Sequence, residues 1–293
     1  MRSVCATVLL GLFSLLACDR QQPSPSGQES ARPRAAALNG ACALSEVQRV
    51  ETSGPAIAPF LSEDGLQVAF SRPKYSELLV ADMRTGSLRS VPCETSYGAR
   101  FVGRDVVTRD RDGTRTVHGA DGRVSQLAPD RGRNETGAAA NGCTYFQEND
   151  AVWSRCAGTV RRMTDGSDRF HSPDLSPDGT RLLVRGLSQG LHVLDLPPAA
   201  SAASPRLRKL GPGSAPRWMP DSHHVIFNLS RDDGKRIIDS ELHLVDVRTG
   251  RSHPITDTPD IHEISPSPSG DGRRIAFEAD MSVFVADLSG CTD

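Results

Sequence analysis

A short turn phrase recurs along this chain, and it constrains the fold more than any other feature. Three copies contain Asp-Gly ahead of an apolar run, at Leu61–Gly65, Leu175–Gly179 and Pro268–Gly272, and a looser copy lies at Trp218–Ser222. In the clear copies the Asp side chain can bond to its own backbone and the Gly tolerates a positive φ, so the phrase predicts a β-hairpin. A chain that repeats one hairpin folds as an array or a propeller.

The intervals between the turn aspartates give the length of the repeat. Asp178, Asp221 and Asp271 are separated by 43 and 50 residues, close to the ~40–45 residues of a four-stranded propeller blade. The longer interval from Asp64 to Asp178 has room for two more units. Two degenerate copies lie inside it, at Phe101–Asp105 and Phe146–Asp150. We therefore expect six units; the Asp150 unit is the shortest, which leaves three or four strands possible there.

A second phrase follows two of the hairpins. Glu77–Gly86 and Glu241–Gly250 share an apolar run that ends in Arg-Thr-Gly, as expected for a third strand joined to a fourth at a turn. Together the two phrases resemble the TolB-type, or PD40, WD40-like repeats of bacterial envelope proteins, in which Ser-Pro-Asp-Gly precedes an Ile/Val-Ala-Phe strand. The resemblance extends over roughly residues 43–290 and implies an all-β, six-bladed β-propeller with a protein partner.

Residues 1–17 have the features of a bacterial lipoprotein signal peptide. Arg2 supplies the positive start, Val4 to Ala17 is uncharged, and Leu15–Cys18 matches the lipobox, in which the Cys takes the lipid. The stretch is shorter than the ~20 apolar residues of a transmembrane helix. An ordinary cleaved secretory signal is the alternative. We expect lipidation at Cys18 and a periplasm-facing protein of the bacterial envelope, with the inner and the outer membrane both open.

Residues 18–42 should form a lipidated, disordered tether, because they contain few large apolar side chains. The propeller domain is then residues 43–293. TolB itself carries an additional N-terminal α/β domain, and the tether shows no pattern of such a domain. We therefore do not expect the Tol-Pal role.

The two ends of the domain match each other. The last repeat has a third-strand run, Met281–Leu288, and little chain after it. The first segment, Leu44–Ser53, resembles the fourth-strand segment Leu88–Ser96 and shares its Glu-Thr-Ser triplet. We expect the N-terminal strand to complete the final blade, because such closure removes an exposed sheet edge.

Five of the seven cysteines remain beyond the lipidation site. Cys143 and Cys156 are symmetric about the Asn149-Asp150 turn and should face each other across a hairpin. Cys42 and Cys291 flank the expected closure and form the second expected disulfide. Cys93 would then be a free thiol. Metal ligation by these cysteines is not expected, because the chain has no Cys-x-x-Cys spacing.

The charge of the chain limits its partners. Removing residues 1–17 leaves 33 basic and 36 acidic side chains, whereas a nucleic-acid binder or a general binder of anionic membranes would be clearly basic. We therefore expect no nucleic-acid partner, and membrane contact through the lipid anchor alone.

Several motifs imitate catalytic or metal sites. Gly186–Gly190 matches the Gly-x-Ser-x-Gly nucleophile elbow in letters, but the elbow needs a following helix and Leu191–Leu196 alternates like a strand. His223 and His224 are adjacent, so on a strand they would point to opposite faces. The acidic runs Asp110–Gly113 and Asp232–Gly234 lack the Glu of a calcium loop. We expect hairpin turns at all of them, with no catalytic residue, metal or cofactor.

The first strand of each blade lines the central channel of a propeller, and the loops that enter it form one face. That face should carry a mixed cluster with excess positive charge, composed of Arg100, Arg169, His171, Arg217, His262 and Glu263. These are either solvated loop residues or a recognition surface for a peptide or acidic partner. The function we expect is a non-catalytic scaffold that binds an envelope protein or peptide. The alternative is a propeller enzyme, of lyase or lactonase type, with a channel-bound metal on His171, His262 and Glu263.

Overall fold

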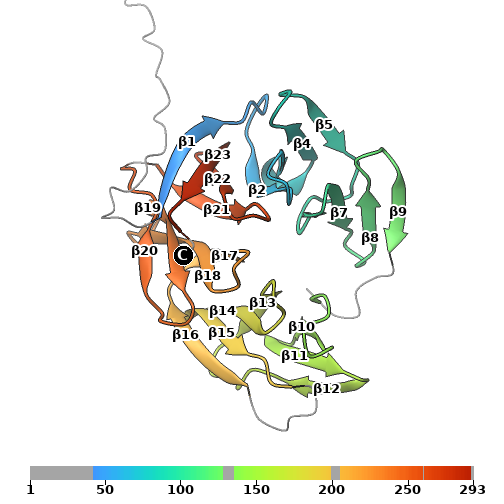
Figure 1. The fold of residues 1–293 in the computed structure, drawn as a ribbon, viewed down its shortest axis with the longest axis vertical. Helices are drawn as coiled ribbons and strands as arrows, with labels where there is room; N and C mark the ends of the chain where they lie inside the picture. Colours follow the sequence, from blue (N-terminus) through green and yellow to red (C-terminus); the bar gives the residue numbers. More distant parts are fainter. Residues whose placement is uncertain (1–41, 128–134, 199–204, 260, 292–293) are drawn as a thin grey trace, which may run out of the picture. The chain divides into compact units, whose positions relative to one another are not determined.

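The computed structural model describes residues 42–127, 135–198, 205–259 and 261–291. These residues form six antiparallel sheets in a propeller arrangement (Figure 1). The expected signal peptide, Cys18 and all but the last residue of the expected tether lie outside the described residues. In the part that is described, no helix is long and apolar enough to cross a membrane.

The sheets follow one another along the chain as blades. Blade 1 contains β2 (Ile57–Leu61), β3 (Gln67–Ser71), β4 (Leu78–Asp82) and β5 (Leu88–Val91), with the short 3-10 helix η1 (Pro73–Tyr75) between β3 and β4. Blade 2 contains β6 (Arg100–Val102), β7 (Asp105–Arg109), β8 (Arg115–His118) and β9 (Val124–Leu127). Blade 3 contains only β10 (Thr144–Glu148), β11 (Ala151–Cys156) and β12 (Thr159–Arg162).

The other three blades again have four strands. Blade 4 contains β13 (Phe170–Leu175), β14 (Arg181–Gly186), β15 (Gly190–Asp195) and β16 (Arg206–Gly211). Blade 5 contains β17 (Ser214–Trp218), β18 (His224–Asp232), β19 (Ile237–Asp246) and β20 (Ser252–Pro254). Blade 6 contains β21 (Glu263–Pro268), β22 (Arg274–Ala279), β23 (Ser282–Ser289) and, as its outer strand, β1 (Ala43–Arg49) from the start of the domain.

This last pairing confirms the six-bladed propeller closed by an N-terminal strand. Leu44 lies opposite Leu288, and Arg49 lies opposite Phe284, with one bulge between these two pairs. Beyond the strand, the N–H of Val50 still donates to the carbonyl of Val283 at 2.9 Å. Residues from the two ends of the domain thus share one sheet.

The hydrophobic core consists of layers between neighbouring blades. Five clusters of buried side chains join blades 1 and 2, 3 and 4, 4 and 5, 5 and 6, and 6 and 1. Figure 1 shows the corresponding order of the sheets. Each second strand contributes apolar residues to both of its faces, as Ile226 and Phe227 of β18 do in separate clusters. This explains why the second strands read as continuous apolar runs in the sequence.

A small residue followed by Pro marks the first strand of four blades. The small residues are Ala58, Ser172, Ala215 and Ser265, with φ between 46° and 55°. Each lies where the register with the second strand shifts, so each is part of a β-bulge, which bends a strand and increases its twist. A small side chain limits the steric cost of a positive φ. The backbone N–H at such a bulge can donate to a neighbouring blade: the Glu278 carboxylate of blade 6 accepts from the N–H of Ala58 in blade 1 at 2.9 Å.

The Asp-Gly turns are held by a shared hydrogen-bond pattern. The hydroxyl of Ser176 donates to Asp178 Oδ1 at 2.7 Å and accepts from the N–H of Arg181 at 2.9 Å. Ser62 and Ser269 repeat both bonds in blades 1 and 6. The Ser two residues before the turn Asp therefore closes the hairpin that the sequence phrase predicts.

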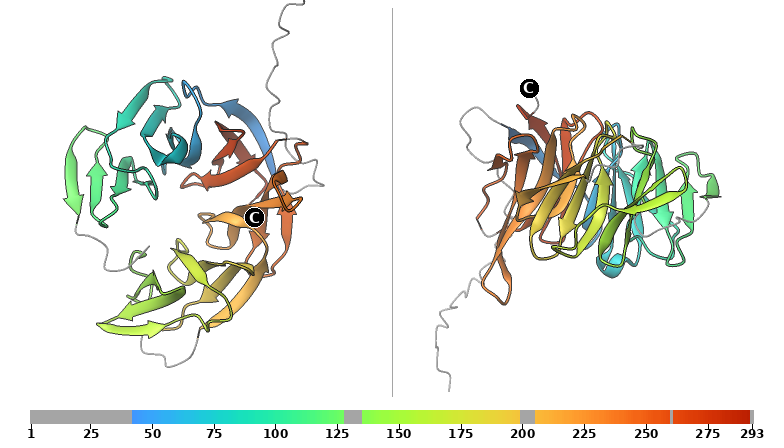
Figure 2. Two further views of the ribbon diagram at one scale, coloured as in Figure 1. Left: turned by 180° about the vertical axis from the view of Figure 1, so that it is seen from behind. Right: turned by 90° about the horizontal axis from the view of Figure 1, so that it is seen from below.

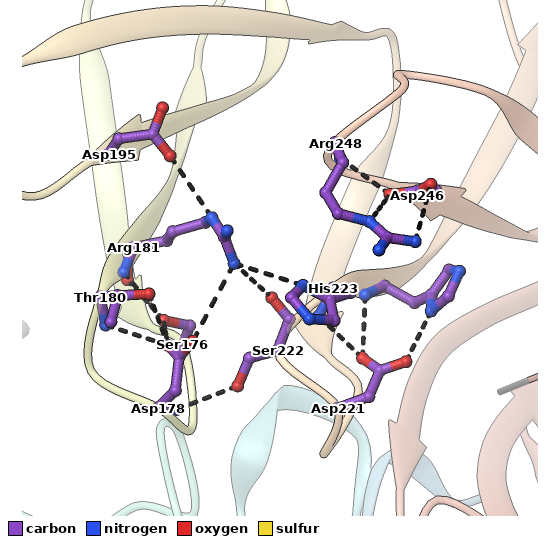
Figure 3. Close-up of polar contacts among 11 residues, drawn as sticks. Ser176, Asp178, Thr180, Arg181, Asp195, Asp221, Ser222, His223, Asp246 and Arg248 are labelled. Atoms are coloured by element: carbon purple, nitrogen blue, oxygen red, sulfur yellow. Dashed lines mark hydrogen bonds and ion pairs between the residues drawn. The ribbon is translucent and has the colours of Figure 1, made fainter. Parts of the chain in front are cut away.

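An arginine after the turn links one blade to the next. Arg181 approaches Asp195 of its own blade at 3.3 Å and donates to the carbonyl of Ser222 in blade 5 at 3.0 Å (Figure 3). Arg274 of blade 6 does the same with Asp287 at 3.0 Å and the carbonyl of Gly65 in blade 1, also at 3.0 Å. These contacts hold the turns of adjacent blades together on one face, which we call the turn face.

Candidate functional site at the central channel

Three charged side chains occupy the same register position on the first strands of different blades. Arg100 of β6, Asp174 of β13 and Arg217 of β17 lie opposite the second-strand residues Val107, Leu183 and Ile226. In a propeller the first strands surround the channel, so equivalent positions form one layer around it. The repeat thereby brings together residues that are 74 and 43 positions apart in the sequence.

The pKa of Asp174 is influenced by both arginines of this layer. Burial raises the pKa of Asp174, while the guanidinium groups of Arg217 and Arg100 both lower it and only partly offset the burial. Two arginines and one carboxylate therefore share the channel layer, and their summed charge is positive when the carboxylate is ionised. Asp174 was not among the residues expected at this site, although the predicted cluster was mixed and included one carboxylate, Glu263.

The other expected residues lie at the start of the first strands. Arg169 directly precedes β13 and is exposed, and His171 of β13 is half-buried. His262 is half-buried and bridges to Ser240 of β19 just before β21 begins. Arg100 and Arg217 are exposed. Five of the six expected residues thus have side chains that solvent reaches.

Glu263 is different, and its expected place on the binding face is wrong. Its side chain is 0% exposed, and its carbonyl accepts from the Ser240 hydroxyl at 3.0 Å. Burial, reinforced by the nearby Glu241, raises the pKa of Glu263 to about 8, and the Thr258 side chain offsets only part of this shift. Within the described residues neither carboxylate oxygen has a hydrogen-bond partner at ordinary distance. Glu263 therefore packs between blades 5 and 6 and cannot contact a partner.

The loops that enter the first strands lie on the same face as those between the second and third strands, because successive strands of a blade alternate in direction. We call this the entry face. Three exposed large apolar residues lie in these loops, and sequence reasoning missed them; they are Tyr97, Leu187 and Met281. Ile237 and Ile238, also exposed, lie beside such a loop at the start of β19. The hairpin of β18 and β19, orange in Figure 2, carries both isoleucines and projects from the molecule.

An aromatic pair on this face lies close to the channel residues in the sequence. Tyr75 of η1 and Tyr97, three residues before Arg100, contact each other edge to face with ring centroids 5.1 Å apart. Tyr97 is 62% exposed. Tyr and Arg are the residue types that contribute most to binding energy at protein interfaces, so Tyr97 and Arg100 form a suitable contact pair for a partner.

Two cavities of the described structure lie away from this layer. One, of about 360 Å³, is lined by Ala140, Gly179 and Pro197 among others. The other, of about 620 Å³, is lined by residues that include Asp271, Arg274 and Asp287. Both adjoin the Asp-Gly turns, so they belong to the turn face and not to the channel layer.

The motifs that imitate catalytic sites have structural roles. Ser188 lies at the tip of the β14–β15 hairpin. The Asp168 carboxylate accepts from the Ser188 hydroxyl at 2.8 Å and from the Ser188 N–H. These and neighbouring hydrogen bonds lower the pKa of Asp168 to about 2, although burial opposes them. His224 Nδ1 is 2.6 Å from Asp221 Oδ2, whereas His223 lies beside Arg181 (Figure 3). Among the described residues, no group of three or more His, Cys, Asp or Glu is arranged to hold a metal.

The cysteines pair across the two places singled out in the sequence. Cys143 and Cys156 are joined in a disulfide beside the β10–β11 hairpin of blade 3. Cys42 and Cys291 are joined at the closure of blade 6. Cys93 is a half-buried free thiol, and burial raises its pKa.

Comparison with known proteins gives the fold but no family. No protein-family model and no curated protein matches the chain. A TolB protein from Agrobacterium tumefaciens is similar with a TM-score of 0.52 at 16% identity, covering 84% of this chain and 98% of that one. A gluconolactonase from Xanthomonas campestris has a TM-score of 0.57 at 15% identity, covering 89% and 96%.

A third solved structure, oligogalacturonate lyase from Vibrio parahaemolyticus, has a TM-score of 0.54 at 9% identity and covers 88% of this chain and 98% of its own. Identities this low show the fold alone, and the set includes both enzymes and TolB. The first-strand bulges, the Asp-Gly turns and the closing strand agree with the same architecture. In fold, the chain is a TolB-like six-bladed β-propeller.

Proposed function

We propose that this protein is a non-catalytic scaffold, anchored in the bacterial envelope through Cys18, whose entry face binds an acidic segment of a protein or peptide. The observation that carries the proposal is the convergence of Arg100 and Arg217 on one layer of the channel. The anchor rests on the sequence of residues 1–18. No nucleic-acid partner is proposed, in keeping with the slight excess of acidic side chains.

The two arginines suit a carboxylate-bearing ligand. An Arg guanidinium binds a carboxylate through two parallel hydrogen bonds, and these are stronger in a partly desolvated site than in water. Asp174 competes for the same guanidinium groups, so it would favour a ligand that carries more than one carboxylate. The exposed apolar side chains around the entry face, Tyr97 above all, would add contact area outside the channel.

The test uses the full chain in its native envelope. A photo-reactive amino acid in place of Tyr97 should cross-link one partner, and Arg100→Glu with Arg217→Glu should abolish that adduct. The matched control is Arg248→Glu on the turn face, where the Arg248 guanidinium donates to Asp246 of its own turn. An adduct that survives the double charge reversal, or is lost equally in the control, would refute the proposed site.

The alternative is a propeller enzyme with a metal in the channel. Its expected ligands were His171, His262 and Glu263, and Glu263 is buried against β19 rather than directed at solvent. Metal analysis of the purified protein separates the two proposals. A tightly held stoichiometric ion would favour the enzyme.

A further inference from the structure

Within the described residues, blade 3 has no counterpart of the outer strand that the other five blades possess. Its sheet ends at β12, whereas each of the other sheets has a fourth strand outside the third. After Arg162 the chain turns inward at once: Met163 donates its N–H to the carbonyl of Val152 at 2.8 Å, and Met163 and Thr164 are buried. Residues 163–169 then lead directly to β13. The place of a fourth strand beside β12 is therefore not filled by the described residues.

The hydrogen-bonding pattern shows which backbone groups face this place. In an antiparallel pair, alternate residues direct both their N–H and their C=O to the same side. Because Met163 bonds to β11, Arg161 must also face β11, and the Ser154 hydroxyl donates to its carbonyl at 3.4 Å. The N–H and C=O groups of Val160 and Arg162 then point away from the sheet. Both residues are exposed, Val160 to 49%.

We propose that the outer edge of β12 binds an extended strand of a partner protein, which completes blade 3 by β-augmentation. Main-chain hydrogen bonds to Val160 and Arg162 would supply the affinity, and the side chains opposite them would supply the selectivity. This site is distinct from the channel layer, so it extends the proposed binding function without depending on Arg100 or Arg217.

The side chains of β12 specify an acidic strand. Residues directly opposite each other on antiparallel strands contact one another, and opposite charges there stabilise the pair. Arg162 is an exposed residue of β12, so an acidic residue should lie opposite it. The same arginine disfavours a second copy of β12 that places Arg162 opposite Arg162, because like charges would then face each other.

The experiment measures where a defined strand binds. The probe is a capped synthetic peptide of alternating Glu and Val, added to the full chain carrying Arg100→Glu and Arg217→Glu so that the channel layer does not attract it. Amide hydrogen exchange at Val160 and Arg162 should slow when the peptide is present. No slowing at these two amides at millimolar peptide would overturn the proposal.

Two valine-to-proline variants provide the matched test. Val160→Pro removes an outward N–H and should weaken peptide binding about tenfold or more, because proline cannot donate to an added strand. Val124→Pro is the control on β9, the outer strand of blade 2. The N–H of Gly119 donates to the carbonyl of Arg123 at 2.7 Å, so the N–H and C=O of the next residue, Val124, point away from the sheet as those of Val160 do. Equal affinities in these two variants would contradict binding at blade 3.

A charge variant keeps the proposal testable if Val160→Pro does not fold. Arg162→Glu should reverse the preference, so that a peptide of alternating Lys and Val binds better than the Glu and Val peptide and protects the Val160 amide. An unchanged preference for the acidic peptide would show that β12 does not select the strand.

Discussion

The buried carboxylate of Glu263 should make the stability of the propeller fall as pH rises. Its pKa is raised from 4.5 to about 8 by burial, with Glu241 and Asp239 adding repulsion and Thr258 offsetting a part. The folded state therefore holds a proton that the unfolded chain releases near pH 4.5. The stability that depends on this proton is complete below pH 4.5 and is lost progressively as pH rises to 8.

The magnitude follows from the difference between the two pKa values. One pKa unit corresponds to ~1.4 kcal/mol, so a change from 4.5 to about 8 amounts to at most about 5 kcal/mol, with about 3 kcal/mol already lost at pH 7. Glu263→Gln has the same shape but no charge to bury. Its free energy of unfolding should match the wild type near pH 4.5 and exceed it by up to about 5 kcal/mol at pH 9.

Urea unfolding followed by circular dichroism at pH 5, 7 and 9 measures this difference directly. Glu51→Gln is the control, because Glu51 is exposed and should leave the pH profile of the wild type unchanged. Parallel profiles for Glu263→Gln and the wild type would refute the reasoning. They would mean that the carboxylate finds compensation at the junction of blades 5 and 6.

Three further predictions concern the anchor, the disulfide of blade 3 and the closure of the fold. Cys18→Ala should release the protein from washed membranes; retention of the variant would contradict lipidation. Peptide mapping without reduction should recover Cys143 linked to Cys156, and reduction of this bridge, whose sequence separation is 13, should cost about 2–3 kcal/mol; two free thiols would contradict it. Deleting residues 19–41 should leave the melting temperature unchanged, whereas deleting 19–53 removes β1 and should destabilise blade 6 by several kcal/mol; equal melting temperatures would contradict closure.

The repeat made most of the architecture predictable. An Asp-Gly turn between apolar runs has one local solution, a hairpin, and its recurrence determines the blade count even where the copies are degenerate, as at Asp105 and Asp150. Closure was predictable for the same reason, because a strand without a hairpin at one end matched a missing strand at the other. The small residue and Pro in the first strands of four blades were also visible in the sequence, but their role in a bulge was not recognised.

The candidate site was predictable only in part. Arg100 and Arg217 followed from their places on first strands, since the repeat places such positions around the channel. Asp174 was missed because its register position, equivalent to those of Arg100 and Arg217, follows only from the strand pairing. Glu263 was misplaced because sequence position gives the strand but not which way the side chain points.

Comparison within the repeat could have corrected the placement of Glu263, which directly precedes the Ile, small residue and Pro of blade 6. The residue at the equivalent position of blade 1 is Ala56, which is fully buried. The amino-acid sequence by itself determined the hairpins, their number and the closing strand, since these depend on local turn chemistry and on a pattern that repeats. Only the tertiary structure decided the raised pKa of Glu263, the place of Asp174 in the layer of Arg100 and, within the described residues, the open edge of β12. Those features depend on how blades pack against each other, and packing joins residues that no local pattern relates.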